Sequence, residues 1–166
     1  MPLDSTIHVI APVSLADYTR PALLVPQLRE RDTPGIISEL SQVLQRDRCV
    51  PDVLPFYHGA LNQELLSNSA LACGIAIPHA RLSGVKQLQF AFGRTSQPVI
   101  WAAKASWPVQ LVFLLAVPAT DAASYLHLLA CIARLGRQPD KLAQLRAADT
   151  PQAIWALLEQ IRIREG

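Results

Sequence analysis

Four histidines are the side chains best suited to chemistry near neutral pH, because a free imidazole changes its charge between about pH 5 and 8. They are His8, His58, His79 and His127. His79 directly follows Pro78, at the end of a short apolar run that opens at Gly74. A largely neutral imidazole at the end of a strand can act as a nucleophile, a base or a metal ligand. His79 is therefore the leading candidate for a functional residue.

His127 falls in the second turn of a predicted helix, on its polar side. With His79 and Cys73 it could complete a three-ligand metal site, but the sequence has no HxxxH or CxxC spacing. A metal-dependent enzyme that uses these three residues is therefore kept only as a subordinate hypothesis. The sequence also has no GxSxG elbow, P-loop or GxGxxG run, and we expect neither a metal nor a bound cofactor.

The elements that must position these residues follow a simple order, with helices first, strands in the middle and helices last. Apolar spacing and caps predict helices over 33–48, 52–66, 122–135, 139–147 and 152–162. Strands are expected over 74–78, 88–92, 99–101 and 109–117, with His79 just past the first of them. This pattern favours a single α/β domain, a mixed β-sheet flanked by helices on both faces (a three-layer sandwich). We expect residues 1–20 to be a loosely attached leader and residues 21–166 to form the domain.

Composition and charge exclude several function classes. The 166 residues are 51% hydrophobic and 17% charged, which excludes disorder over most of the chain. With 15 Lys and Arg against 13 Asp and Glu, the net charge of +2 does not point to a nucleic-acid partner. The long apolar run 109–117 is too short to insert into a membrane, and we see no secretory signal. Three isolated cysteines suit a reducing compartment, so we expect a cytoplasmic protein.

The segment GIAIPHAR, residues 74–81, resembles the active-site segment of the fructose/mannitol-type enzyme IIA domains of the bacterial phosphoenolpyruvate-dependent sugar phosphotransferase system. That group includes nitrogen-regulatory relatives. The two helices before the segment, the strands 88–92 and 109–117 and the helix containing residues 126–129 follow in the family's order and spacing. The resemblance extends over about residues 24–161.

The resemblance implies a phosphotransferase. In such domains a histidine accepts a phosphoryl group from the histidine phosphocarrier protein and passes it to a cysteine of an enzyme IIB; a regulatory relative would instead signal to a target protein by its phosphorylation state. The accepting role maps onto His79. A second family histidine, which lines the same site, maps onto His127. No metal or nucleotide is needed for this transfer.

Three positions near the motif bear on how well it would work. Gln63 stands where the family usually has an arginine, and an amide cannot bind a phosphate as a bidentate cation does. Ser69 keeps a hydroxyl where the family has a threonine, and Arg81 keeps one cation close to His79. The efficiency of transfer is therefore in doubt. A non-catalytic regulatory interaction module, with the same fold and a weakened site, is the alternative hypothesis.

Overall fold

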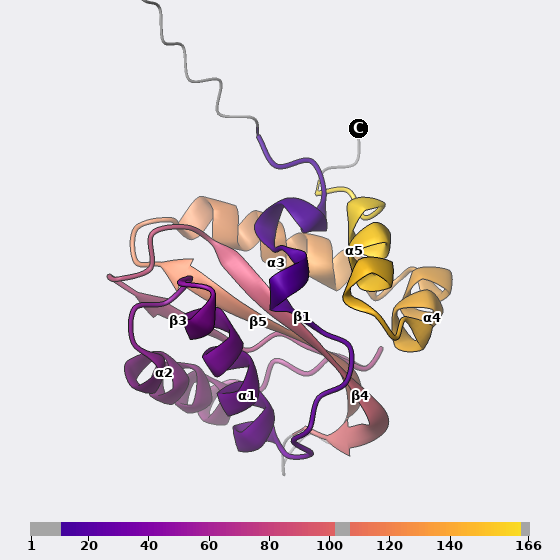
Figure 1. Cartoon of the computed structure of the whole chain (residues 1–166), viewed down its shortest axis with the longest axis horizontal. Helices are drawn as coiled ribbons and strands as arrows, with labels where there is room; N and C mark the ends of the chain where they lie inside the picture. Colours follow the sequence, from indigo (N-terminus) through magenta and orange to yellow (C-terminus); the bar gives the residue numbers. More distant parts are fainter. Residues whose placement is uncertain (1–10, 102–106, 164–166) are drawn as a thin grey trace, which may run out of the picture.

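The computed structural model describes residues 11–101 and 107–163. A mixed sheet lies between two layers of helices (Figure 1). One face carries α1 (Thr33–Arg46) and α2 (Val53–Leu66). The other face carries α3 (Ala122–Leu135), α4 (Pro139–Ala147) and α5 (Pro151–Glu159), together with the short 3-10 helix η1 (Leu15–Tyr18). A second 3-10 helix, η2 (Pro21–Leu23), precedes the first strand. The expected α/β fold with helices on both faces is confirmed.

The sheet is built around its longest apolar strand pair. Its strands are β1 (Leu24–Val25), β2 (Ile75–Ala76), β3 (His79–Leu82), β4 (Gln89–Ile100) and β5 (Pro108–Pro118). The order is β1-β4-β5-β2, and β3 also pairs with β5. β5 runs antiparallel to β4 and parallel to β2 and β3, with His79 opposite Leu115. The histidine segment therefore lies at one edge of the sheet, held by the buried strand β5.

Side chains of β5 alternate between two cores. Phe113 and Leu115 pack on the side of α3 and α5, in what we call the first core. Val112 and Leu114 pack on the side of α1 and α2, in the second core. All four are fully buried, as expected for a central strand covered on both faces. The near-continuous apolar run of the sequence therefore marked the centre of the molecule.

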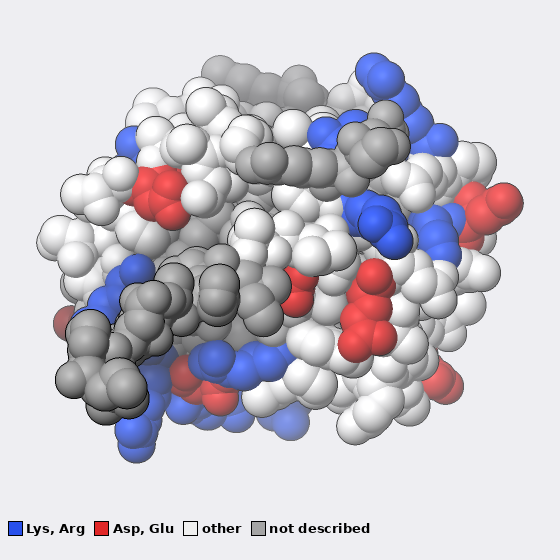
Figure 2. Space-filling model, turned by 90° about the horizontal axis from the view of Figure 1, so that it is seen from above, with Lys and Arg blue, Asp and Glu red and all other residues white. Residues whose placement is uncertain are grey.

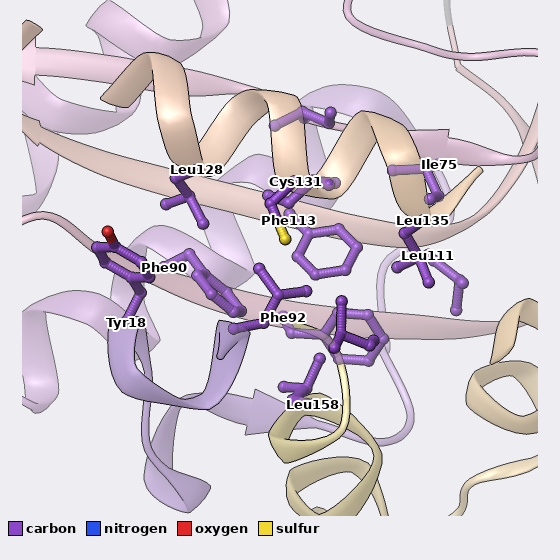
Figure 3. Packing of buried hydrophobic residues seen from close by; sticks show 14 of the residues in the cluster. Tyr18, Ile75, Phe90, Phe92, Leu111, Phe113, Leu128, Cys131, Leu135 and Leu158 are labelled. Carbon is purple, nitrogen blue, oxygen red and sulfur yellow. The ribbon is translucent and has the colours of Figure 1, made fainter. Parts of the chain in front are cut away.

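Three phenylalanines form the middle of the first core (Figure 3). The Phe113 ring lies 5.4 Å from the Phe90 ring and 5.0 Å from the Phe92 ring, the latter edge-on. Tilted and edge-to-face pairs of this kind are the favoured arrangement of buried aromatic rings. They join β4 to β5 directly beneath α3.

The helix α1 begins at Thr33, the first residue of the expected range 33–48. Asp32 caps it by accepting a hydrogen bond from the Gly35 amide at 2.7 Å. The Thr33 hydroxyl instead donates to the Trp101 carbonyl oxygen, at the far end of β4. Because Thr33 has this tertiary partner, the cap moves to the preceding carboxylate.

The strands near the candidate site also differ in extent. His79 does not follow a strand but begins one, β3, after β2 ends at Ala76 and Pro78 separates the two. The expected strands 88–92 and 99–101 merge into the single strand β4, which carries a register shift between Arg94 and Val99. A bulge of this kind hides the continuity of a strand from a period-2 pattern.

The described part of the expected leader belongs to the fold. Leu15 and Tyr18 are buried in the first core, and the Leu15 amide donates to the Ile161 carbonyl at 2.9 Å. The Thr19 hydroxyl donates to the Phe90 carbonyl at 2.8 Å. From Ser14 onward the segment is therefore firmly attached, because its apolar side chains cover β4 beside α5. Residues 1–10 of the expected leader lie outside the described residues.

Charged side chains of both signs are interspersed over the face shown in Figure 2. Neither Lys and Arg nor Asp and Glu dominate that face. This distribution agrees with the small net charge of the chain.

Candidate phosphoryl-transfer site

His79 is held where β3 begins, at the edge of the sheet. The Leu115 amide donates to the Pro78 carbonyl at 2.9 Å, so β5 fixes the backbone on the N-terminal side of the histidine. Ala80 packs in the second core beside Gly59 of α2. Because neighbouring side chains of a strand point to opposite faces, His79 and Arg81 share the other face. His79 is half-buried there, and Arg81 is exposed.

A shallow hollow of about 340 Å³ lies between α2 and β3. Its lining is Gly59, Gln63, His79, Ala80 and Arg81. Three of the residues expected from the sequence are thus brought together. Gln63 contributes an uncharged amide and Arg81 the cation of this group.

Tyr125 of α3 lies against the imidazole. Its hydroxyl oxygen is 3.4 Å from His79 Nε2, and the two ring centroids are 5.1 Å apart. The Arg81 guanidinium carbon lies 5.9 Å from the centroid of the same tyrosine ring, within the range of a cation–π contact. The three side chains therefore form a small cluster in which the imidazole and the guanidinium both lie close to the tyrosine ring.

The environment keeps the imidazole neutral. Burial lowers the pKa of His79, since the charged form loses hydration; a backbone hydrogen bond with Ile77 opposes this and the nearby Arg81 charge adds to it. Burial also raises the pKa of Tyr125, which keeps its hydroxyl protonated, and Arg81 opposes that shift. At pH 7 the pair is an uncharged imidazole facing an uncharged phenol.

A backbone hydrogen bond with Ile77 also acts on the ring. An interaction that raises the pKa of a histidine is one in which a ring N–H donates, so the Ile77 carbonyl is the acceptor. The Nε2 atom is the ring nitrogen that faces the Tyr125 hydroxyl. A neutral imidazole keeps a lone pair on one of its two nitrogens, which can act as a nucleophile.

Ser69 does not line the hollow. Its hydroxyl donates to the Glu64 Oε1 atom at 3.0 Å and accepts from the Ile77 amide at 2.9 Å. Ser69 therefore acts on the backbone that leads to His79, and the structure does not place it beside the imidazole.

The structure does not bring His127 to His79. Its side chain is exposed on α3, two residues beyond Tyr125. Positions two apart on a helix differ by about 200° in direction, so the side chains of 125 and 127 point nearly opposite ways. Tyr125 occupies the position beside His79 that we expected for His127.

Two residues of the site escaped the sequence reasoning. Tyr125 carried no local signal except that it lies in the first turns of the helix after β5. Glu64 did carry one, since it falls on the buried face of α2, four and eight residues after Ala60 and Phe56. A carboxyl group at an apolar helix position indicates an internal partner.

The described residues hold no group of three or more His, Cys, Asp or Glu side chains placed to bind a metal ion. Cys73 packs against the first core instead of facing His79. The hypothesis of a metal-dependent enzyme therefore lacks the convergence of ligands that it requires.

Comparison with known proteins identifies the architecture. Residues 20–161 match the family model of the phosphoenolpyruvate-dependent sugar phosphotransferase system, EIIA 2. The chain belongs to this family. Among its relatives, a nitrogen regulatory protein of Bradyrhizobium diazoefficiens is 33% identical over 149 residues, which cover 87% of this chain and 94% of that protein. A similar alignment with the fructose-specific EIIABC component of Bacillus subtilis is 30% identical but covers 80% of this chain and 21% of the larger protein.

Solved structures of EIIA proteins agree with the fold. The nitrogen regulatory protein IIA-Ntr of Neisseria meningitidis superposes with a TM-score of 0.72 at 27% identity, covering 87% of this chain and 98% of that one. Mannitol IIA of Escherichia coli reaches the same TM-score at 14% identity, covering 84% and 97%. The chain is thus an EIIA phosphotransfer domain. In the described residues, no helix is both long enough and apolar enough to span a bilayer.

Proposed function

We propose that His79 is the phosphoryl acceptor of this EIIA domain, receiving the group from a histidine phosphocarrier protein. The observation that supports this most directly is the environment of the ring. The imidazole is half-buried beside the hollow, burial lowers its pKa, and its Nε2 atom faces the Tyr125 hydroxyl at 3.4 Å. Its neighbour Arg81 supplies a cation at the rim of the hollow.

The transfer balances without a metal or an additional base. The Nε2 lone pair attacks the phosphorus atom of the donor phosphohistidine, and the new N–P bond forms as the donor's N–P bond breaks. The electron pair of that bond returns to the donor imidazole. In this step the proton of the His79 ring stays on Nδ1, where its positive charge offsets the negative charge of the phosphoryl group. Catalysis in such transfers is mainly positioning and electrostatic stabilisation.

The residues around Nε2 supply donors for the phosphoryl oxygens. Tyr125 has the closest hydroxyl, at 3.4 Å, and it must turn from the nitrogen toward an oxygen when phosphorus binds there. The Arg81 guanidinium and the Gln63 amide lie on the open side. Hydrogen bonds from charged donors to phosphate are about twice as strong as neutral ones, so Arg81 is the main candidate for charge stabilisation. His127, which lies apart from this cluster, is assigned no direct contact.

For the acceptor, two kinds of partner fit the chain's relatives. One is a cysteine of an enzyme IIB, and a similar fold is known in the complex of mannitol IIA with phosphorylated IIB from Escherichia coli. The other is a regulatory target that reads the phosphorylation state, as the nitrogen regulatory relative suggests. We favour the regulatory role, in the cytoplasm, because the relative that aligns over 94% of its own length carries that name.

Intact mass measurement tests the proposal. The chain is incubated with phosphoenolpyruvate, enzyme I and the histidine phosphocarrier protein, beside the variants His79→Ala, His58→Ala and His127→Ala. We expect one acid-labile phosphoryl group that is absent only from His79→Ala. His58 and His127 are exposed histidines and serve as matched controls. Full phosphorylation of folded His79→Ala would refute the assignment.

The alternative, a non-catalytic interaction module, is favoured by one observation: the α2 side of the hollow carries the neutral Gln63. Gln63→Arg separates the two hypotheses. If phosphorylation of the wild-type chain is undetectable and rises sharply in Gln63→Arg, the natural site is a weakened one. If the wild-type chain is already phosphorylated and the variant changes its rate little, Arg81 suffices.

A further inference from the structure

Glu64 is a buried carboxyl group that the transfer chemistry does not use. It is 4% exposed and lies on the buried face of α2, in line with Ala60 and Phe56. Acidic side chains are almost never this buried unless they have partners. Glu64 has three donors, all directed at one oxygen.

These donors come from two different parts of the chain. The Ser69 amide and hydroxyl donate to Glu64 Oε1 at 2.8 and 3.0 Å. The indole N–H of Trp101, at the end of β4, donates to the same atom. Trp101 is itself fully buried in the second core. The carboxyl group therefore anchors the turn that follows α2 to the far end of β4.

Ser69 extends this anchor toward the functional histidine. Its hydroxyl accepts from the Ile77 amide at 2.9 Å while it donates to Glu64. Ile77 is buried and follows β2, two residues before His79. Ser69 thus holds the Ile77 amide, in the peptide unit that joins Ala76 to Ile77.

The backbone of Ile77 also acts on the imidazole. A backbone hydrogen bond with Ile77 raises the pKa of His79 against the effect of burial, and β5 fixes the adjacent Pro78 carbonyl at 2.9 Å from the Leu115 amide. Hydrogen bonds therefore lead from Glu64 through Ser69 to the Ile77 amide, two residues before His79.

We propose that Glu64 is a positioning residue for His79: its buried carboxyl group, acting through Ser69, fixes the Ile77 backbone that orients the imidazole and its tautomer. The consequence for phosphoryl transfer rests on the proposed role of His79, but the orientation of the ring does not. Glu64 touches neither the ring nor the place of the phosphoryl group, so its effect is indirect.

Two substitutions separate positioning from a through-space charge effect. Glu64→Gln removes the acidic group but keeps an amide oxygen for Ser69 and Trp101. Glu64→Leu has a similar size and leaves all three donors without an acceptor. The groups that face the His79 ring directly, Tyr125 and Arg81, are unchanged in both.

Glu39 offers a matched control on the other helix of that layer. It accepts from the Arg29 and Glu30 amides at 2.9 and 3.0 Å, and no contact joins it to the residues of the site in the described structure. Glu39→Leu therefore also deprives backbone amides of their acceptor, but away from His79. Glu39→Leu thus measures the effect of losing a carboxyl acceptor for backbone amides at a place remote from His79.

The measurement is ¹⁵N NMR of the histidine rings in the unphosphorylated chain, followed by phosphorylation kinetics. In Glu64→Leu we expect the Nδ1–H tautomer of His79 to lose population and its pKa to fall below the wild-type value, because the bond to Ile77 raises that pKa. Transfer should slow by about 10- to 100-fold, the usual effect of a misplaced reacting group. Glu64→Gln should keep most of the tautomer population and rate. Glu39→Leu should leave both as in the wild type.

Two results would overturn the proposal. One is a folded Glu64→Leu chain with the wild-type tautomer and pKa of His79. The other is an equal fall of that pKa in Glu64→Gln and Glu64→Leu, which would indicate a charge effect alone. If Glu64→Leu does not fold, Ser69→Ala decides, since it removes only the hydroxyl link and must change the His79 tautomer. Failure of phosphorylation in every variant and in the wild type, with the NMR differences present, would refute the proposed function and leave the positioning role intact.

Discussion

Arg81→Gln is the sharpest test of how this site handles phosphoryl charge. Arg81 lies two residues after His79 on the same face of β3, so about 7 Å separates the two positions along the strand. Gln63, on the opposite side of the hollow, brings no charge. If the phosphoryl group on His79 is stabilised by a cation within the hollow, that cation is Arg81.

The expected magnitude is modest because Arg81 is exposed. A phosphoryl group of charge about −2 attracts a unit charge at about 7 Å by roughly 1.2 kcal/mol in a medium as polar as water. Screening at physiological ionic strength, with a Debye length of about 8 Å, reduces this to roughly 0.5 kcal/mol. Arg81→Gln should therefore lower the equilibrium phosphorylation by about 2- to 8-fold, with the larger value at low salt.

The assay measures phosphorylation at equilibrium with the phosphorylated donor protein, at salt concentrations from about 0.01 to 1 M. Arg137→Gln is the matched control, because Arg137 is an exposed arginine two residues beyond the end of α3, and the helix from Tyr125 to Leu135 alone is about 15 Å long; this variant should have almost no effect. A loss that is the same at every salt concentration would refute the electrostatic reasoning. So would an equal loss in both variants.

Four other measurements address the histidine, its neighbour and the core. Burial lowers the pKa of His79, so as the pH falls the imidazole of the unfolded chain is protonated before that of the folded chain. The free energy of unfolding should therefore fall as the pH drops through about 6.5. Urea titrations should show a weaker dependence of that free energy on pH in His79→Asn than in the wild type. Phosphorylation should stay constant from pH 8 to about 6.5, where the ring is neutral. Tyr125→Phe should change the pKa of His79 by less than about one unit in an NMR titration, because a 3.4 Å contact is long for a hydroxyl donor and such bonds contribute at most about 1.5 kcal/mol. Phe113→Ala should cost about 3–5 kcal/mol in urea denaturation, since it empties the centre of the first core; a cost below about 1 kcal/mol would contradict the packing described.

Most of the fold was predictable because its signals are local. Caps and apolar spacing gave α1 and α2, and the unbroken apolar run 109–117 marked β5 as the central strand. The merging of two expected strands into β4 was not predictable, because its register shift interrupts the alternation on which strand recognition depends. The attachment of residues 14–19 was missed for another reason. The partners of Ser14 and Leu15 lie at residues 161–162 and that of Thr19 at Phe90, and no local pattern reports such distant contacts.

In the candidate site, too, the residues with local sequence signals were predictable and those that depend on distant contacts were not. His79, Gln63 and Arg81 lie close in sequence to the motif that indicated them, and the structure brings them to one hollow. The partner from α3 depends on which side of that helix faces β3, because Tyr125 and His127 point in directions about 200° apart around its axis. Hydrophobic spacing predicted that helix but left the direction of its polar residues ambiguous. A single helix has several partly polar lines, and only the packing on β5 selects the one that faces the site.

The bonds between Leu15 and Ile161 and between Val13 and Ile163 also determine the order in which the protein can be completed. Nearly the whole described chain separates these partners, so closing them carries a high loop-entropy cost and contributes late to folding. During synthesis Leu15 emerges long before Ile161 and Ile163. On the ribosome, therefore, the helices and strands around His79 can assemble before these two segments meet.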